Sequence, residues 1–295
     1  MTTTVRELYR MDEVSLYTPP VKFRNMVQIE PVESERGIGI EIEVENHALK
    51  AGVSSGAWSA TADGSLRNAG QEYVSRPMMA KYAPQMLQEL LGDCLDANEC
   101  CFSPRTSIHV HVNMQDVPTD VVEDIVLLYS VFEKLFFRFT GRGRIKNIYC
   151  VPIIDTDVMN HMKTVGFNHV RAAWSKYAAL NLLPVAEYGT IEFRHMHGTF
   201  DIKKVCVWIR LITKLVDYVV ANKGCSKTIA MMGPGFDYPT LLKDIFGLDA
   251  EYLKYQHYND VKQGVGRTKT AFTSNKTVQA LMTTRDMKSA YFLGQ

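Results

Sequence analysis

Apolar and polar residues alternate strictly in four short segments of the chain. These segments read GIGIEIEVE at 37–45, QEYVS at 71–75, SIHVHVN at 107–113 and GTIEFRHM at 189–196. A period of two residues is typical of a strand that buries one face and leaves the other polar. We therefore predict four such strands, and their polar faces are where function is expected.

Three other segments have the spacing of helices. Residues 84–98 place apolar side chains along one stripe, and residues 118–139 begin with Pro118 and acidic residues, as a helix start favours. A third helix is predicted to start at Asp201 and to end near Gly224. Helices between alternating strands predict an α+β fold, with an antiparallel sheet that has one face in the core and one exposed.

Changes in the pattern of apolar and polar residues divide the chain into three parts. Residues 1–34 are predicted to be an irregular N-terminal arm without chemistry, and residues 35–225 hold the alternating strands and helices. After Cys225, glycine, threonine and lysine replace the alternation, which predicts a mobile C-terminal appendage over residues 226–295.

The amino-acid composition argues against some classes of protein. The 295 residues include 33 Lys+Arg against 32 Asp+Glu, a balance that argues against a nucleic-acid binder driven by bulk charge. A hydrophobic content of 46% supports a substantial core. The first residues carry charges where a signal peptide needs an apolar run, and no apolar run reaches the ~20 residues that span a bilayer. Six cysteines without a CxxC pair predict reduced thiols. We expect a cytoplasmic protein without a membrane partner.

Strand alternation also places the candidate chemistry. Side chains two residues apart share a face, so one strand presents three carboxylates, another two imidazoles, and a third an acid beside an arginine. These residues, with a shorter strand and its preceding turn, are Glu41, Glu43, Glu45, His109, His111, Glu192, Arg194, Glu72 and Asp63.

If the strands pair in one sheet, these groups converge on one surface. Two carboxylates about 4 Å apart repel by about 4 kcal/mol at an effective dielectric of about 20, so such a cluster takes up protons or binds cations. Oxygen-rich ligands favour Mg²⁺ or Mn²⁺, and Mg²⁺ is commonly shared with phosphates. The pattern therefore suggests a divalent metal with a nucleotide.

Simpler interpretations compete with this one. The glutamates of the first strand are equally explained as the solvated face of a sheet, and Glu45 is the one most expected at the surface. His109 and His111 are also explained as a hydrogen-bonded pair beside a carboxylate. The recurrence of polar faces on separate strands favours function.

From Gly37 to Val220 the chain resembles the amidoligases, relatives of glutamate-cysteine ligase and glutamine synthetase. The motifs that carry the resemblance are GIEIE at 39–43, DGSL…QEYVSRP at 63–77, HVHV at 109–112, RIKNIYC at 144–150 and KYAALNL…GTIEFRHMHGTFD at 176–201. The resemblance implies a curved antiparallel sheet with helices on its convex face, as in glutamine synthetase and glutamate-cysteine ligase, with residues 35–225 as the catalytic domain.

The resemblance also implies an activity. It is that of an ATP- and Mg²⁺-dependent (or Mn²⁺-dependent) ligase, which joins a carboxylate and an amine through an acyl phosphate. The substrates would be small molecules or peptides, and an oligomer is compatible with this reading.

Each candidate residue has an implied role. Glu41, Glu43, Glu72 and Glu192 correspond to metal ligands, Arg194 to a contact with the phosphates, and Asp63 to an acid that receives the amine. His109 or His111 would contact nucleotide or metal. Arg144, which leads RIKNIYC, would contact an anion, although Arg142 and Arg144 are equally explained as a solvated turn.

Other residues of the matching motifs have ordinary explanations. Lys176, Tyr177 and Asn181 match the family, but a strand entering the core also accounts for Tyr177 and Asn181. The Cys100–Cys101 pair and Cys150 are interpreted as packing residues.

Two other functions remain open. HVH at 109–111 and HMH at 195–197 could form a four-imidazole transition-metal site in a cupin-like barrel, but His195 and His197 fall on the face opposite Glu192 unless a bulge intervenes. A ligase-like fold could also be a non-catalytic binding module, with its C-terminal tail as the contact region.

Overall fold

The computed structural model describes most of the chain between residues 3 and 253. The described residues are 3–20, 29–45, 56–67, 70–95, 102–141, 143–153, 171–172, 174–223 and 238–253. Arg142, Gly224, the Cys100–Cys101 pair and most of the C-terminal tail therefore lie outside the described residues.

A mainly antiparallel, curved open sheet forms the centre of the fold. Its strands are β1 (Gly37–Val44), β2 (Trp58–Thr61), β3 (Gln71–Ser75), β4 (Met78–Met79), β5 (Ser107–Asn113), β6 (Leu180–Asn181) and β7 (Thr190–His197). The order is β2-β3-β1-β5-β7-β6, with β4 paired to β1. The four predicted strands are β1, β3, β5 and β7, and the α+β class is confirmed.

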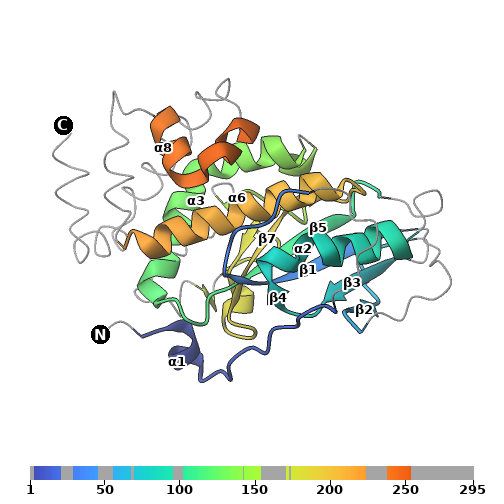
Figure 1. Cartoon of the computed structure of the whole chain (residues 1–295), viewed down its shortest axis with the longest axis horizontal. Helices are drawn as coiled ribbons and strands as arrows, with labels where there is room; N and C mark the ends of the chain where they lie inside the picture. Colours follow the sequence, from blue (N-terminus) through green and yellow to red (C-terminus); the bar gives the residue numbers. More distant parts are fainter. Residues whose placement is uncertain are drawn as a thin grey trace.

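The two long helices, α3 and α6, lie against one face of this sheet (Figure 1). The α-helices are α1 (Val5–Tyr9), α2 (Ala83–Leu87), α3 (Thr119–Thr140), α6 (Ile202–Ala221) and α8 (Tyr238–Phe246). Helical turns of the 3-10 or π type are η1 (Ala80–Tyr82), η2 (Gln88–Cys94), η3 (Arg144–Lys146), η5 (Leu183–Val185) and η6 (Gly247–Leu253). Within the described part of the chain, no helix is both long and apolar enough to cross a membrane.

The predicted helices are confirmed, with one change. Pro118 is the N-cap of α3, and the Asp201 carboxylate caps α6 by accepting from the backbone N–H of Lys204 at 3.0 Å. The segment predicted at 84–98 starts as α2, continues as the π-helical turn η2 and ends at Cys94, where Leu95 is already extended.

The core lies between the helices and the apolar face of the sheet. Ile40 of β1, Val110 of β5 and Phe193 of β7 are fully buried there, together with Trp208 of α6. Because neighbouring side chains on a strand point in opposite directions, burial of these residues directs their polar neighbours to the other face. That second face is the candidate site.

The described part of the C-terminal segment belongs to the same core. Ile245 and Phe246 of α8 are buried, and the Phe246 ring lies edge-on to Phe132 and Phe136 of α3, with centroids 5.6 and 6.1 Å away. Residues 238–253 therefore differ from the mobile appendage that the sequence suggested. The division of the chain at residue 225 stays a prediction.

The N-terminal arm is also more ordered than its sequence indicated. Thr4 and Glu7 form a capping box at the start of α1, and the backbone N–H of Val5 donates to the carbonyl of Val117 at 3.0 Å. Farther on, Tyr17 forms a bridge with Met78. In Figure 1 the arm, coloured dark blue, runs along the sheet from α1 toward β4.

Candidate functional site

Strand register brings the candidate residues together. Glu43 of β1 lies directly opposite Glu72 of β3, and Glu41 of β1 lies opposite His109 of β5. His111 of β5 pairs in turn with Glu192 of β7. Directly opposite residues project from the same face of an antiparallel sheet, so groups from distant parts of the sequence meet on one surface.

A bulge in β7 completes the arrangement. Between the pairs Ile108–Met196 and Val110–Phe193, one residue of β5 faces two residues of β7. Those two residues are Arg194, which stays on the site face, and His195, which packs among the helices. A bulge of this kind redirects side chains next to a site without ending the strand.

Glu41 bridges both imidazoles. Its Oε2 lies 3.1 Å from Nδ1 of His109, and its Oε1 lies 3.1 Å from Nε2 of His111. Burial raises the pKa of Glu41, but its contacts with the two histidines lower it more, so the net pKa is well below its usual value. Burial lowers the pKa of His111, but its contact with Glu41 raises that pKa above the usual value. Glu41 is therefore held as a carboxylate at the centre of the sheet.

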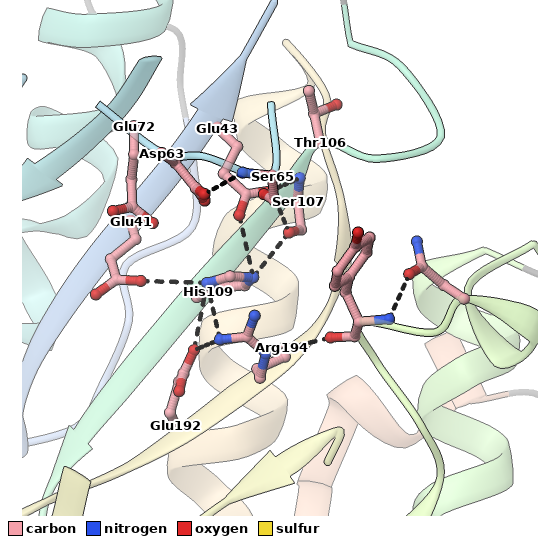
Figure 2. A network of polar contacts seen from close by, with 12 residues as sticks. Glu41, Glu43, Asp63, Ser65, Glu72, Thr106, Ser107, His109, Glu192 and Arg194 are labelled. Atoms are coloured by element: carbon pink, nitrogen blue, oxygen red, sulfur yellow. Dashed lines mark hydrogen bonds and ion pairs between the residues drawn. The ribbon is translucent and has the colours of Figure 1, made fainter. Parts of the chain in front are cut away.

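His109 links Glu41 to Glu43 through a serine (Figure 2). Its Nε2 lies 2.7 Å from the Ser107 hydroxyl, which donates to Glu43 Oε2 at 2.6 Å. The backbone N–H of Ser107 donates to the same oxygen at 2.8 Å. His109 and Glu43 are both buried, so this chain fixes their orientation beneath the surface of the site.

Glu192 and Arg194 form the charged pair of β7. An Arg194 Nη1 hydrogen donates to Glu192 Oε1, and the Asn181 amide donates to Glu192 Oε2 at 2.7 Å. The Arg194 Nε donates to the carbonyl of Tyr149 at 3.3 Å. Burial raises the pKa of Glu192, but the positive charge of Arg194 brings it below its usual value. Glu192 also lies 3.3 Å from His109 Nδ1, which ties this pair to the rest of the cluster.

Glu72 lies among several carboxylates, and their negative charge affects its pKa. Burial and the nearby carboxylates of Glu41, Glu43 and Asp63 raise its pKa to about 7. Asp63 lies in the predicted turn, where its carboxylate accepts from the backbone N–H of Ser65 at 2.7 Å. An acid that is this hard to ionise indicates a place where a proton or a cation is needed.

Among the residues that the structure describes, three groups of side chains have the geometry to hold a metal ion, with ligand atoms within 4.8 Å of one another. These groups are Glu41–Glu72–His109, Glu41–His111–Glu192 and Glu43–Asp63–Glu72. Their donors are mainly carboxylate oxygens with imidazole nitrogens and without thiolates, a set that fits Mg²⁺ or Mn²⁺. The residues present therefore fit the divalent metal expected from the sequence.

A pocket of about 700 Å³ opens beside the cluster. Glu41, Glu72 and His111 of the cluster line it, together with Met11 and Leu16 of the N-terminal arm. A cavity of this size accommodates a small molecule. The arm, for which no chemistry was predicted, thus forms one wall of the candidate site, and nothing in its composition signalled this.

Arg144 lies apart from the acids. Its guanidinium is buried and donates from Nε to the carbonyl of His195 at 3.1 Å and from Nη2 to the carbonyl of Arg194 at 2.8 Å. It therefore holds the backbone of the bulge that carries Arg194. An anion contact by Arg144 stays a prediction, and Arg142 lies outside the described residues.

The position of Glu45 differs from the one expected from the sequence. The sequence favoured a surface position, but only 2% of Glu45 is exposed. Its Oε1 accepts from the backbone N–H of Arg67 at 2.8 Å and from the Arg105 Nε at 3.0 Å. The expectation was wrong because the loop segments that carry these two partners cover the end of β1. Glu43 is buried as well, so a simple solvated face does not describe this strand.

The cupin-like alternative is also wrong. His195 is fully buried against the rings of Phe137 and Trp208, and its Nε2 lies 2.6 Å from the Tyr129 hydroxyl. Burial, with a smaller effect from Arg144, lowers its pKa well below the usual value. The bulge leaves His195 on the helix side, so it does not meet His109 in a four-imidazole site.

Several contributors were missed or left undecided. Ser107 shares a face with His109 two residues later, so alternation could have identified it. Asn181, left undecided, holds Glu192. Tyr177 is 40% exposed, with its ring edge-on to Tyr149 at 5.7 Å, and Cys150 is fully buried, which confirms it as a packing residue.

A comparison with models of known protein families supplies a match. Residues 13–216 match the model of a protein family described as "putative amidoligase enzyme". No curated protein shows a significant match to the chain.

Proposed function

The chain belongs to the amidoligase family, and from this membership and the acidic site we propose that it is an ATP- and Mg²⁺-dependent ligase that joins a carboxylate to an amine. The matched region, residues 13–216, contains every residue of the acidic cluster. The observation that carries the proposal is the convergence of Glu41, Glu72 and Glu192 around potential cation sites beside a pocket.

The residues that would hold Mg²⁺ are those of the three metal-binding groups. Mn²⁺ would fit the same donors. When bound, the metal would neutralise the phosphates of ATP and orient them for transfer. Glu41 and Glu72 each belong to two of the groups, which makes them the central ligands. Either histidine of HVHV fits a role as an additional ligand or nucleotide contact, since His109 and His111 each belong to one group.

Arg194 is proposed to stabilise the transferred phosphoryl group. Its guanidinium is held from two sides, by Glu192 and by the Tyr149 carbonyl, so its direction is set before substrate arrives. In this step an oxygen of the substrate carboxylate attacks the γ-phosphorus of ATP, the bond to ADP breaks, and an acyl phosphate forms. A positive charge fixed in advance offsets the negative charge that develops during such a transfer.

The second step joins the amine. Its nitrogen attacks the acyl carbon, the carbon–oxygen bond to phosphate breaks, and the nitrogen loses a proton as the amide forms. Asp63 is proposed to receive that proton, because it lies beside Glu43 and Glu72 and its carboxylate is oriented by Ser65.

The direct test is product analysis with ATP, Mg²⁺ and a panel of amino acids and dipeptides, supplied with ammonium or simple amines. We expect phosphate and ADP to be released only when both an acid and an amine are present. Glu192→Gln should abolish release, whereas Glu251→Gln, an exposed change on η6, should leave it intact. Release of AMP and pyrophosphate would refute the acyl-phosphate route. Tight binding of ATP without turnover on any acid–amine pair would indicate the non-catalytic binding module instead.

A further inference from the structure

The pocket beside the acidic cluster has a chemical character that bears on substrate choice. Glu41 and Glu72 line it together with residues of the N-terminal arm, and two exposed acids, Asp12 of the arm and Glu187 between η5 and β7, form its rim. None of the described residues that line it is a lysine or an arginine. The basic group that does line it, His111, is already paired with Glu41 at 3.1 Å.

The opposite end of the site holds arginine side chains. Arg194 lies beyond His109, next to the Tyr149 carbonyl, and Arg105 lies near the end of β1, where it pairs with Glu45. At that end each arginine offsets an acid, Glu192 for Arg194 and Glu45 for Arg105, whereas the described lining of the pocket has no lysine or arginine to offset its carboxylates. Phosphates favour the end with Arg194, and the pocket end favours a group without negative charge.

Metal binding does not remove this difference. Bound cations would neutralise Glu41 and Glu72, which belong to the metal-binding groups, but Asp12 and Glu187 belong to none of them. A free amine resembles the lysine side chain, whose usual pKa is about 10.4, so it reaches the pocket as an ammonium ion. The carboxylates at the rim attract such a cation and repel a substrate that carries a carboxylate into the pocket.

Much of the remaining wall of the pocket is apolar, and its arm part is held in place. Its apolar members are Met11, Val14, Leu16, Ile38, Val74 and Pro77. The Gln115 side chain fixes the arm part of this wall, because its Oε1 accepts from the Val14 N–H at 3.1 Å and its Nε2 donates to the Asp12 carbonyl at 3.2 Å. A ligand that fills the space would bury a hydrocarbon chain against this wall.

We infer that this pocket is the entry and binding site of the amine substrate, and that it selects a primary amine carried on an apolar chain. The inference rests on the proposed ligase function for the reaction that the amine undergoes. Its specificity is argued from the size of the cavity, the carboxylates that line it and the apolar side chains of its wall. The acid substrate and the nucleotide then approach from the end with Arg194.

The test is direct binding of matched probes to the full chain with Mg²⁺ and without nucleotide, measured by isothermal titration calorimetry. Hexylamine and hexanoate share a chain and differ in the sign of the end group. We expect hexylamine to bind at least about tenfold more tightly than hexanoate, and shorter amines to lose about fourfold in affinity per methylene removed. Equal or tighter binding of hexanoate would overturn the inference.

Variants locate the effect at the rim. Asp12→Asn and Glu187→Gln should each weaken hexylamine binding about threefold, and together about tenfold, as expected for exposed charge pairs. Glu13→Gln is the matched control, because Glu13 is adjacent in sequence but pairs with Arg6 outside this pocket. Equal affinity in the double variant and the wild type would also overturn the inference.

The outcome separates this inference from the proposed function. Binding needs no turnover, so selective hexylamine binding in a protein that never releases phosphate would leave the pocket assignment standing and remove the ligase. The opposite result is amine-dependent turnover that is insensitive to the Asp12 and Glu187 substitutions, without selective binding of hexylamine. It would leave the ligase function standing and remove the pocket assignment.

Discussion

Two clusters of charged residues in this protein, each with buried members, contrast in how their charges balance. Between α6 and η6, Asp249 accepts from the Arg210 Nε at 3.1 Å and from the Lys214 Nζ at 2.7 Å, and Glu30 lies 3.1 Å from Arg210. Two cations there face two acids, of which Asp249 is buried and Glu30 is exposed. Burial raises the pKa of Asp249, but hydrogen bonds from Arg210 and Lys214 bring it below its usual value. This cluster is complete without any ligand.

The sheet face is different. Its acids are Glu41, Glu43, Asp63, Glu72 and Glu192, and the arginine among them is Arg194. The two histidines offset only part of the excess, and Glu72 keeps a pKa of about 7 as a result. Buried charge alone therefore does not indicate function, since the Arg210 cluster is charged and structural. A buried cluster that stays unbalanced until cations arrive does indicate it.

The largest expected effect is on activity. Glu192→Gln removes a carboxylate from a potential metal group and leaves Arg194 without its partner, so turnover should fall at least about a hundredfold. The stabilisation of the protein by Mg²⁺ and ATP in a thermal melt should disappear as well. Glu251→Gln, measured in parallel, should keep both. A Glu192→Gln protein that retains the thermal shift would contradict the site assignment.

The next effect is on stability and belongs to the balanced cluster. Asp249→Asn leaves Arg210 and Lys214 without their shared acid, which should lower the free energy of unfolding by about 3 kcal/mol. Chemical denaturation measures this change. Mn²⁺ affinity should not change, because the substitution is far from the acidic face. A loss of metal binding in this variant would contradict the assignment of separate roles to the two clusters, one structural and one metal-binding.

A subtler change tests the role of Arg194. Arg194→Lys keeps the positive charge but loses the planar fork that reaches both Glu192 and the Tyr149 carbonyl. We expect turnover to fall about tenfold while the thermal shift with Mg²⁺ and ATP persists. Unchanged turnover would mean that charge alone, without direction, is enough.

The smallest effect has the opposite sign. In the presence of a chelator, Glu72→Gln should raise the free energy of unfolding at pH 8 by about 1 kcal/mol, because it removes repulsion among the carboxylates. The sign follows from the raised pKa: an acid that holds its proton up to about pH 7 when folded, against a usual value of 4.5, makes stability fall as pH rises between those values. The variant should lose that part of the slope, and a steeper slope would contradict the electrostatic account.

Much of the fold followed from alternation and helical spacing. Residues such as Ile40 and Val110 had to share a buried face, so Glu41 and His109 were correctly expected on the other. The pairing of Glu43 with Glu72 was not readable, because register depends on turns and on the packing of the whole sheet. The convergence of the acids was therefore a hypothesis until the strands were placed side by side.

Local rules failed where distant segments cover a strand. Glu45 was assigned to the surface because alternation cannot foresee that Arg67 and Arg105 would close over it. The arm gave no sign that Met11 would line a pocket, since its contact depends on Gln115, about a hundred residues away. Candidate residues on strands were thus predictable, whereas the walls around them required the tertiary structure.

The central claim is that the acidic face binds divalent cations, and electron paramagnetic resonance of Mn²⁺ tests it most directly. Titration of the full chain should show Mn²⁺ bound with defined stoichiometry, displaced by Mg²⁺ and tightened by ATP. Glu41→Gln and Glu72→Gln should each remove most of this binding, and Glu251→Gln should not. Mn²⁺ that stays free in solution, or that binds equally to all of these variants, would contradict the account.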